Sequence, residues 1–473
     1  MRAAPALCLI RMAGAGNAVP VPGHSKIYPR SAKGFYTRWR WFFVFATQLF
    51  FYGMPWLQWG GRQAMLFDID ARRFYIFGLV LYPQDVFYLA ALLIISALLL
   101  FLFTAVAGRQ WCGYACPQTV YTEIFLWVEE KFEGNRAQRM RLDGAPLSWN
   151  KFWRKGGKHL VWLVIGLWTG FTFVGYFTPI RELALQVLAF SVGPWALFWI
   201  LFYGFATWGN AGFMREQVCK YMCPYARFQG AMFDRDTLIV TYVAKRGEPR
   251  GKRSKKADYK ADGLGDCIDC TMCVQVCPTG IDIRDGLQYE CISCAACIDA
   301  CDDVMDMMGY PRGLIRYSTE AAIEKDWGKK EIVQRVKRPR VLIYATVLLL
   351  ASVALATSLW LRTPFKVDIL RDRATMARLV KGGEIENVYR IHVMNATERE
   401  QTFVLAVEGL PHLALAEGTR TAVTIGPEQS ASVPVQLRLP HGEASPGSHR
   451  IAFVVSAEGV GSVREKSAFI VPR

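Results

Sequence analysis

Long apolar runs alternate with charged segments along the first three quarters of the chain. Five windows contain no charged residue, and each is long enough to cross a hydrocarbon layer of about 30 Å as a helix. These windows are residues 41–60, 86–107, 160–178, 195–214 and 341–361. Buried helices of a large soluble protein would carry charged residues every turn or two. The pattern therefore predicts an integral membrane α-helical protein with five transmembrane helices.

The pattern changes after residue 361, where apolar and polar residues alternate in short segments separated by Gly, Pro and Asn. These segments are residues 387–393, 402–407, 421–425, 432–439, 449–455 and 466–471. Short alternating strands at roughly ten-residue spacing are typical of a small all-β sandwich. Residues 362–473 contain no grouping of His, Cys or carboxylates that would suggest chemistry. We therefore expect a binding or docking role for this domain.

The formal net charge of +16 is distributed unevenly along the chain. The segments before the first window, between the second and third, and between the fourth and fifth hold 38 Lys and Arg, whereas the other two connections hold four. Because cytoplasmic loops are enriched in Lys and Arg, we expect the N-terminus and residues 215–340 inside and residues 362–473 outside. Residues 245–260, with eight Lys and Arg, are predicted to be flexible and to face anionic lipid or solvent, so no nucleic-acid partner is expected.

Twelve of the thirteen cysteines lie between residues 112 and 301 in short regular spacings, which favours metal ligation over disulfides. Eight of them form the bacterial ferredoxin pattern twice, as C-x2-C-x2-C-x3-C. Because two-cluster ferredoxins exchange the fourth ligand, one 4Fe-4S cluster is expected on Cys267, Cys270, Cys273 and Cys301, and the other on Cys291, Cys294, Cys297 and Cys277. Structural zinc is the alternative, but zinc sites usually show paired spacings. Asp302 stands where a second Pro is usual, and the spacer between the repeats is short.

A second array reads C-x-Y-x-C-P twice, each time after an apolar hairpin. It consists of Cys112, Cys116, Cys219 and Cys223. A spacing of four predicts that both thiols of a motif share one helix face, with the following Pro ending or kinking the helix. The repetition suggests two divergent copies of one hairpin unit. Soft thiolates favour cuprous copper, zinc or iron-sulfur, the same dithiols could cycle through a disulfide, and Met214 and Met222 could add thioether ligands.

The expected organisation follows from these windows and motifs. It comprises a cytoplasmic N-terminal segment 1–40, a first hairpin 41–117, a basic loop 118–159, a second hairpin 160–224, a basic linker 225–261, a ferredoxin-like domain 262–310, a basic connection 311–340, a fifth helix 341–361 and an exported domain 362–473. None of the six His lies in an apolar window, so a haem between two intramembrane histidines is not expected. No P-loop and no C-x-x-C-H motif is present.

This combination of motifs resembles the FixG/CcoG/RdxA family of cytochrome c oxidase accessory proteins. The resemblance rests on the two C-x-Y-x-C-P motifs, the double ferredoxin motif, the segment 67–78 and the single span before an exported immunoglobulin-like domain. It implies a bacterial inner-membrane protein with two 4Fe-4S clusters that assists maturation of cbb(3)-type cytochrome oxidase, with cupric ion reduction as its activity. The implied partners are oxidase subunits or copper-handling assembly factors, and an unidentified electron donor.

Two other functions remain open at this point. The quinol-oxidising subunit found beside periplasmic nitrate reductase is similar in its four-helix core and cysteine motifs, but it lacks the fifth span and the sandwich. A non-enzymatic copper scaffold would use the same thiols without redox chemistry. Our hypothesis is that electrons from a cytoplasmic or quinol donor pass through the two clusters. They would then reduce copper at the catalytic thiols Cys112, Cys116, Cys219 and Cys223.

Overall fold

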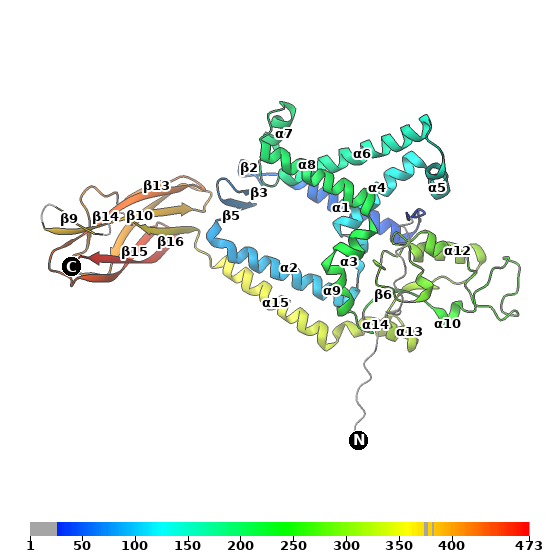
Figure 1. Cartoon of the computed structure of the whole chain (residues 1–473). Helices are drawn as coiled ribbons and strands as arrows, with labels where there is room; N and C mark the ends of the chain where they lie inside the picture. Colours follow the sequence, from blue (N-terminus) through cyan, green and yellow to red (C-terminus); the bar gives the residue numbers. More distant parts are fainter. Residues whose placement is uncertain (1–25, 373–376, 381–382, 473) are drawn as a thin grey trace, which may run out of the picture.

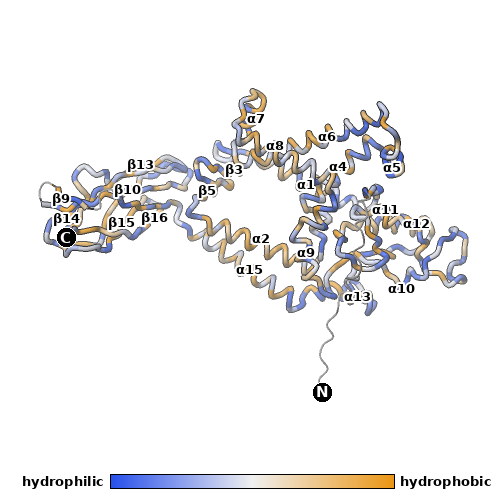
Figure 2. Tube along the Cα trace, viewed as in Figure 1, coloured by the Kyte–Doolittle hydropathy of each residue, from blue (hydrophilic) through white to orange (hydrophobic). Residues whose placement is uncertain are grey.

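The computed structural model describes residues 26–372, 377–380 and 383–472, so most of the N-terminal segment 1–40 lies outside the described residues. The molecule is elongated (Figure 1), with a β-sandwich at one end, the cysteine-rich domain at the other and long helices between them. Apolar residues dominate these long helices, as Figure 2 shows for α2 (Val86–Ala107) and α15 (Pro339–Trp360). The longest apolar stretches thus lie in the middle of the molecule, whereas apolar and polar residues are mixed at its two ends.

A helix lies at each of the five apolar windows. They are α1 (Phe35–Gly53), α2, α6 (Trp149–Val174), α8 (Pro194–Gly209) and α15. Within the described residues, three helical stretches are long and apolar enough to cross a membrane, namely Pro83–Ala107, Trp149–Val174 and Pro339–Trp360. Helix α8 has 16 residues, and α1 begins with a turn that contains Arg38 and Arg40. These three helices identify the chain as a membrane protein, whereas the topology with five transmembrane helices stays a prediction.

The prediction of a helix over residues 41–60 is wrong in its last third, because α1 ends at Gly53. Pro55 lies in the 3₁₀ turn η1 (Met54–Trp56). Strands β1 (Gln58–Trp59) and β2 (Arg62–Gln63) then form a tight hairpin. The hairpin turn places Gly60 and Gly61 at φ of 56° and 82°, which glycine adopts without strain. Pro55 and these two glycines therefore stop the helix although the residues remain apolar.

Helices α6 and α8 pack closely through glycines. A Cβ on Gly166 would lie 2.6 Å from the carbonyl oxygen of Gly204, so the two backbones touch at this point. In an apolar medium the hydrophobic effect does not drive helices together. Small residues instead let two helices approach closely and associate by van der Waals packing. Helix α2 runs beside α15 (Figure 1), where the Tyr88 hydroxyl lies 3.2 Å from Ser358 Oγ. The short helix α7 (Ile180–Leu188) joins α6 to α8.

The segments expected as basic loops and linkers are largely ordered. Residues 118–159 form α4 (Pro117–Glu133), α5 (Arg136–Gly144) and the first turns of α6. The expected linker 225–261 contains α9 (Pro224–Met232), β6 (Ile239–Tyr242) and α10 (Ala244–Gly247). The connection 311–340 contains β7 (Ile315–Ser318), α13 (Glu320–Glu324), α14 (Lys329–Gln334) and η6 (Arg335–Lys337). Charge density was a poor guide to order here, because buried apolar residues alternate with the charged ones.

The ferredoxin-like domain is closed by a two-stranded sheet from outside its cysteine motifs. Strand β6 pairs antiparallel with β7, and both pack on α11 (Met272–Gln275), η5 (Ile283–Asp285) and α12 (Ala296–Met308). The core includes Val240, Ile298 and Ile315, all fully buried. The domain therefore extends on both sides of residues 262–310.

Residues from 365 onward form two packed antiparallel sheets, as expected. The first has the order β12-β14-β10-β8 with β9 beside β10, and the second has the order β13-β11-β15-β16. The strands are β8 (Phe365–Arg371), β9 (Arg378–Val380), β10 (Glu384–Asn395), β11 (Gln401–Glu408), β12 (Ala414–Leu415), β13 (Ala422–Ile425), β14 (Ser430–Pro440), β15 (Gly447–Ala457) and β16 (Gly461–Val471). All six expected strands are present, and β8, β9 and β12 were not predicted.

The sandwich is held against the membrane helices by a separate three-stranded sheet that was not predicted. Its strands are β3 (Met65–Asp68), β4 (Arg73–Ile76) and β5 (Leu79–Leu81), followed by η2 (Pro83–Asp85). Met394 of the sandwich packs in the same apolar cluster as Tyr75 and Tyr82. The buried carboxylate of Asp85 accepts a hydrogen bond from Arg362 at 2.7 Å. The segment 67–78 quoted for the family resemblance is thus part of a docking platform.

Candidate metal centre

Two small cavities inside the ferredoxin-like domain are lined by cysteines. One is lined by Cys267, Cys270, Cys273 and Cys301. The other is lined by Cys277, Cys291, Cys294 and Cys297, with Cys273 on the wall between them. Each triplet thus lies beside the fourth cysteine of the other repeat. Neither the Asp302 departure nor the short spacer prevents this arrangement.

The two cysteine loops have the same unusual backbone. In the first loop Asp269 and Thr271 have φ of 52° and 58°, and in the second Ser293 and Ala295 have φ of 54° and 61°. Left-handed residues beside right-handed ones turn successive N–H groups toward one concave side, and such nests bind anionic groups, iron-sulfur clusters among them. The sequence spacing predicted the ligands but not this repeated conformation of non-glycine residues.

Burial makes the ionisation of these thiols depend on a positive charge beside them. Burial raises the pKa of Cys273, of Cys291 and of Cys301 to about 12 each, because the thiolate loses its hydration. A metal cluster supplies the positive charge that deprotonates such thiols. Among the described residues, no three Cys, His, Asp or Glu side chains are close enough to share one metal ion. The four cysteines around each cavity match the ligand number of a cubane cluster.

The C-x-Y-x-C-P motifs do not place both thiols on one helix face, which corrects the sequence-based expectation. Cys112 lies in the short helix α3 (Gln110–Tyr114), whereas Cys116 caps the start of α4. Cys219 lies in the π-helical turn η4 (Val218–Met222), and Cys223 caps the start of α9. The proline of each motif occupies the first position of the following helix, where its missing N–H costs nothing. Each proline thus begins a helix.

The four membrane-edge thiols nevertheless gather in one region. Burial raises the pKa of Cys219 to about 12, and Cys116, Cys112 and Cys223 add to the rise by charge repulsion. This coupling needs the four sulfurs to lie within electrostatic reach of one another. The Sγ of Cys112 lies 3.5 Å from the side-chain amide of Gln229 on α9. The thiols are clustered, yet no three of them close around a single ion in this structure.

The membrane-edge thiols lie directly against the second cysteine cavity. A Cβ on Gly113 would lie 2.7 Å from the carbonyl oxygen of Ile292, so the two loops are in backbone contact. Cys112 packs in the apolar cluster that contains Val276 and Cys294. The two cysteine arrays therefore form one continuous structure.

A buried arginine fixes this junction. The Nε of Arg109 donates to Oε1 of Gln229 at 2.7 Å, and its Nη1 donates to the carbonyl oxygen of Cys291 at 3.4 Å. Sequence reasoning assigned Arg109 no role. The available signal was a single cation immediately after an apolar window and three residues before a cysteine motif.

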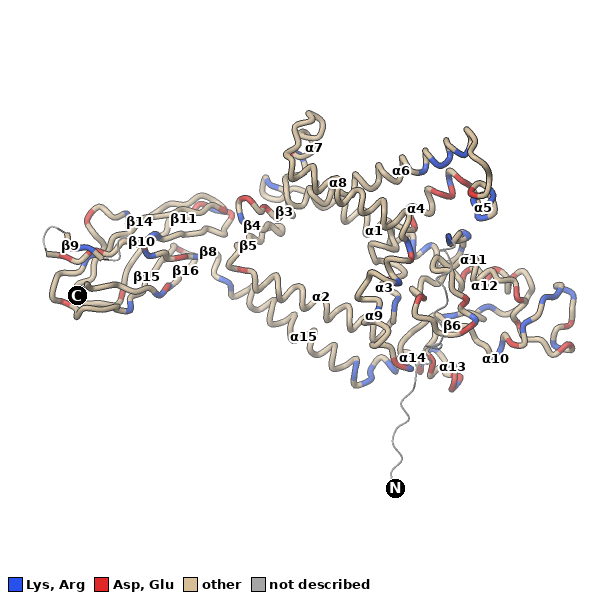
Figure 3. The backbone as a smooth tube through the Cα atoms, viewed as in Figure 1, with Lys and Arg blue, Asp and Glu red and all other residues tan. Residues whose placement is uncertain are grey.

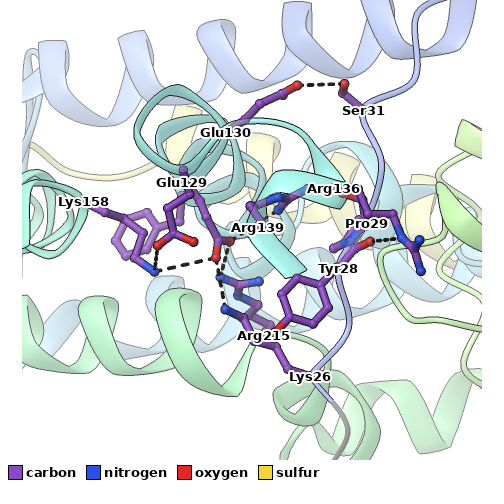
Figure 4. A network of polar contacts seen from close by, with 12 residues as sticks. Lys26, Tyr28, Pro29, Ser31, Glu129, Glu130, Arg136, Arg139, Lys158 and Arg215 are labelled. Atoms are coloured by element: carbon purple, nitrogen blue, oxygen red, sulfur yellow. Dashed lines mark hydrogen bonds and ion pairs between the residues drawn. The ribbon is translucent and has the colours of Figure 1, made fainter. Parts of the chain in front are cut away.

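A buried ion network lies on the other side of the same helices (Figure 4). Glu129 on α4 is fully buried, and its carboxylate lies 2.7 Å from Arg215 and 3.6 Å from Lys158. Burial alone would raise the pKa of Glu129, but Arg215, Lys158 and Lys26 outweigh it and lower the pKa to about 2. Lys158 also lies 2.7 Å from Glu133. This network joins α4 and α6 to the loop that precedes the second cysteine motif.

Comparison with known proteins places this architecture in a family. The nitrogen fixation protein FixG of Rhizobium meliloti is 38% identical over 468 residues. The match covers 90% of this chain and 89% of the length of FixG. The RdxA and RdxB proteins of Cereibacter sphaeroides are 39% and 40% identical, and they cover 81% and 84% of this chain. Both comparisons also cover more than four fifths of the relatives' own lengths. The chain belongs to the FixG/RdxA family.

Three family models match within this FixG/RdxA chain. A 4Fe-4S dicluster domain matches residues 214–320, and an Ig-like fold described as the C-terminal part of FixG, a putative oxidoreductase, matches residues 355–472. These matches confirm the ferredoxin-like and immunoglobulin-like domains. A further 4Fe-4S binding domain matches residues 89–135, which contain Cys112 and Cys116. An iron-sulfur family model thus extends to thiols for which the sequence favoured copper.

Proposed function

We propose that this FixG/RdxA protein carries electrons through two 4Fe-4S clusters to the membrane-edge thiols, where Cu(II) is reduced to Cu(I) for assembly of a cbb(3)-type cytochrome oxidase. Family membership and the iron-sulfur domains support electron transfer in oxidase-related processes. The observation that carries the finer proposal is the backbone contact between Gly113 and the Ile292–Cys294 loop. Electrons that reach the second cavity would need no further carrier to reach Cys112.

The protein's own residues define the proposed route. Cys273 borders both cavities, which keeps the two clusters close together. Clusters bound there supply single-electron transfer. Arg109 holds the second cysteine loop against α9. Electrons held in the Cys267 cavity would therefore reach the membrane-edge thiols through the Cys277 cavity.

Copper enters this proposal as substrate. Thiolates are soft ligands that favour Cu(I) over harder ions, so reduction and retention would occur at one place. Because burial raises the pKa of Cys219 and of Cys112, to about 12 and about 11, metal binding would displace thiol protons. The immediate recipients would be oxidase subunits or copper-handling assembly factors, and the immunoglobulin-like domain would dock them.

The proposed location is the bacterial inner membrane, with the iron-sulfur domain inside and the sandwich outside. Figure 3 supports this orientation, because Lys and Arg concentrate at the ends of α5, α6 and α15 near the cysteine-rich domain. The middle of α2 and of α15 is almost free of charge in the same view. A concentration of Lys and Arg at one end of the apolar helices is typical of the cytoplasmic side.

The decisive experiment uses full-length protein prepared anaerobically and reduced in advance, with excess reductant removed. Stoichiometric Cu(II) is added and Cu(I) is measured with a chelator. Cys116→Ser with Cys223→Ser should abolish Cu(I) formation and binding while the cluster spectrum persists, because serine is a hard ligand. Ser432→Ala on the sandwich serves as a control. Unchanged Cu(II) reduction by the double variant would refute the proposal.

The match of residues 89–135 to a 4Fe-4S binding domain favours a second candidate for the same thiols. Cys112 and Cys116 are the two cysteines of that stretch, so a cluster there would need Cys219 and Cys223 as well. A third cubane would raise the iron content from about eight to about twelve per chain. Replacing Cys116 and Cys223 would then remove about four iron, whereas a copper site predicts no loss of iron.

A further inference from the structure

An open cavity of about 750 Å³ lies beside the second C-x-Y-x-C-P motif. Its wall is formed by α6 and by the chain from η3 (Asn210–Met214) to η4. A cavity of this volume is in the range, about 300–1,000 Å³, that holds small organic ligands. Neither the iron-sulfur proposal nor the copper proposal gives this cavity a role.

Aromatic rings line the cavity around a single histidine. The ring of His159 stacks on Phe213 with centroids 5.5 Å apart and an interplanar angle of 14°, and it meets Trp162 edge-on at 5.1 Å. The Nδ1 of His159 is buried and has no hydrogen-bond partner among the residues that the structure describes. The imidazole as a whole lines the cavity. The site thus offers a flat aromatic surface beside one titratable ring.

The backbone of the cavity wall is irregular in a way typical of functional sites. Both η3 and η4 are π-helical turns, which are rare and frequently occur at such sites. Between them Arg215 has φ of 41°, a strained conformation for a residue with a side chain. The Arg215 guanidinium donates to Glu129 at 2.7 Å, so its charge is neutralised within the protein.

The remaining cations of the cavity are paired as well. Lys158 lies 2.7 Å and Lys155 3.1 Å from Glu133, which argues against a phosphate or another anion as the ligand. Several apolar side chains of the wall are exposed, Phe213 and Met222 at 56% each. In a membrane protein this exposed apolar rim would face lipid. A ligand of neutral, aromatic and lipophilic character fits these properties.

The cavity is adjacent to the proposed redox centre. Tyr221 and Met222 line it, and both lie between Cys219 and Cys223 in the sequence. An aromatic, proton-releasing ligand bound here would therefore contact the turn that carries Cys219 and leads to Cys223. Redox-active quinols of the membrane have this chemistry: a flat ring, two hydroxyl groups and an isoprenoid chain.

We propose that this cavity binds an isoprenoid quinol as the electron donor of the protein, an inference that rests on the proposed function. One quinol would lose two electrons and two protons to become the quinone, and the electrons would reduce two Cu(II) to two Cu(I). The imidazole of His159, which lines the cavity, accepts the first hydroxyl proton, releases it to water at the cytoplasmic edge, and then accepts the second. The ring lies against Phe213 and Trp162, and the isoprenoid chain leaves past Met222 into lipid.

The test uses the full chain in lipid nanodiscs with decylubiquinol as donor and, separately, an azidoquinone as a photoreactive probe. In the wild type, quinol should drive Cu(I) formation at two Cu(I) per quinol, and the probe should label peptides that contain residues 149–174 or 210–222. His159→Gln should slow the quinol-driven reaction at least tenfold. Protein reduced in advance should still convert stoichiometric Cu(II) at the wild-type rate in this variant, since that reaction bypasses the cavity.

Matched controls separate this site from general damage. Phe213→Ala should weaken probe labelling and quinol oxidation, whereas Phe205→Ala, on the exposed face of α8 outside the cavity, should change neither. His441→Gln on the sandwich is the control for His159. Labelling confined to other parts of the chain, or quinol oxidation unaffected by His159→Gln and Phe213→Ala, would overturn the inference.

Failure of this inference and failure of the proposed function are distinguishable. If protein reduced in advance converts Cu(II) but quinol neither labels nor reduces the wild type, the quinol site is wrong and copper reduction stands. If quinol reduces the clusters and the probe labels the cavity but no Cu(I) forms, the quinol site stands and copper reduction is wrong. The second result would favour a quinol dehydrogenase.

Discussion

Gly113 lies against the backbone of Cys294: a Cβ added to the glycine would be 2.8 Å from the Cα of the cysteine. Glycine is thus needed at this position for space, since its own φ is not left-handed. The contact joins the first membrane-edge motif to the loop that lines the second cysteine cavity. Any larger residue would have to push the ferredoxin-like domain away from the thiols.

We therefore predict that Gly113→Ala slows electron transfer to the membrane-edge thiols without loss of the clusters. A displacement of about 1 Å can cost up to about 100-fold in rate, so Cu(II) reduction by protein reduced in advance should fall by about 10- to 100-fold. Gly156→Ala on α6 is the matched control, since its Cβ would meet nothing within 4 Å. Equal rates in the two variants would show that the contact does not limit transfer.

A second prediction concerns how the two cysteine triplets share ligands. If Cys301 completes the first triplet, Cys301→Ser and Cys270→Ser damage the same cluster, and the double variant should lose no more iron than either single variant, about four per chain. Combining Cys301→Ser with Cys294→Ser should instead remove about eight. Iron and acid-labile sulfide assays check this. The opposite pattern would mean that each repeat binds its own cluster.

The cysteine spacings, together with the ligand exchange of two-cluster ferredoxins, predicted which thiols line each cavity, because C-x2-C-x2-C leaves a loop few ways to point three sulfurs inward. They were insufficient at Cys112 and Cys116, where a spacing of four suggested one helix face. Instead, α3 ends at Tyr114 and Pro117 begins α4 directly after Cys116, so the two thiols belong to different helices. Local sequence shows that a proline interrupts a helix, but tertiary packing decides whether the helix ends before it or starts with it.

Contacts between distant segments were beyond the reach of the sequence for the same reason. Arg109 meets Gln229 and Cys291 across more than a hundred residues, and no periodicity relates them. Strands β3 to β5 were missed because they are three or four residues long and carry charged residues such as Arg73. Their apolar side chains are buried against Met394 of the sandwich, and the local sequence does not predict this contact.

A third prediction concerns the buried carboxylate of Glu129. Glu129→Gln leaves Arg215 without its counter-charge, and breaking a buried ion pair typically costs about 3–5 kcal/mol. The thermal unfolding temperature should therefore fall clearly, whereas Asp326→Asn, which breaks an exposed pair with Lys245, should have little effect. Adding Arg215→Met to Glu129→Gln should restore part of the lost stability, because the added substitution removes the unpaired cation.

The pH dependence of this loss has a defined sign. The pKa of Glu129 is lowered to about 2 in the folded protein, below its ordinary value of about 4.3. The contribution of the Glu129 carboxylate to folding stability is therefore fully present above about pH 5 and disappears as the pH falls through about 2. The stability difference between wild type and Glu129→Gln should be constant from pH 6 to 8 and shrink in acid. A difference that grows in acid would contradict the ion-pair explanation.

A fourth prediction tests the orientation, which depends on charge more than on geometry. If the 38 Lys and Arg on one set of segments mark the cytoplasm, a reporter fused after Lys260 is inside and a reporter fused after Arg399 is outside. Alkaline phosphatase should be inactive in the first fusion and active in the second, and green fluorescent protein should show the reverse. Arg399 lies just before β11, so the second fusion should be repeated after Val471 to avoid interrupting the sandwich.

The two fusion sites are separated by α15, which is long and apolar enough to span a membrane. Activity of the same reporter at both sites would therefore mean that α15 does not cross the membrane, and copper reduction inside could then not supply a recipient outside through this domain.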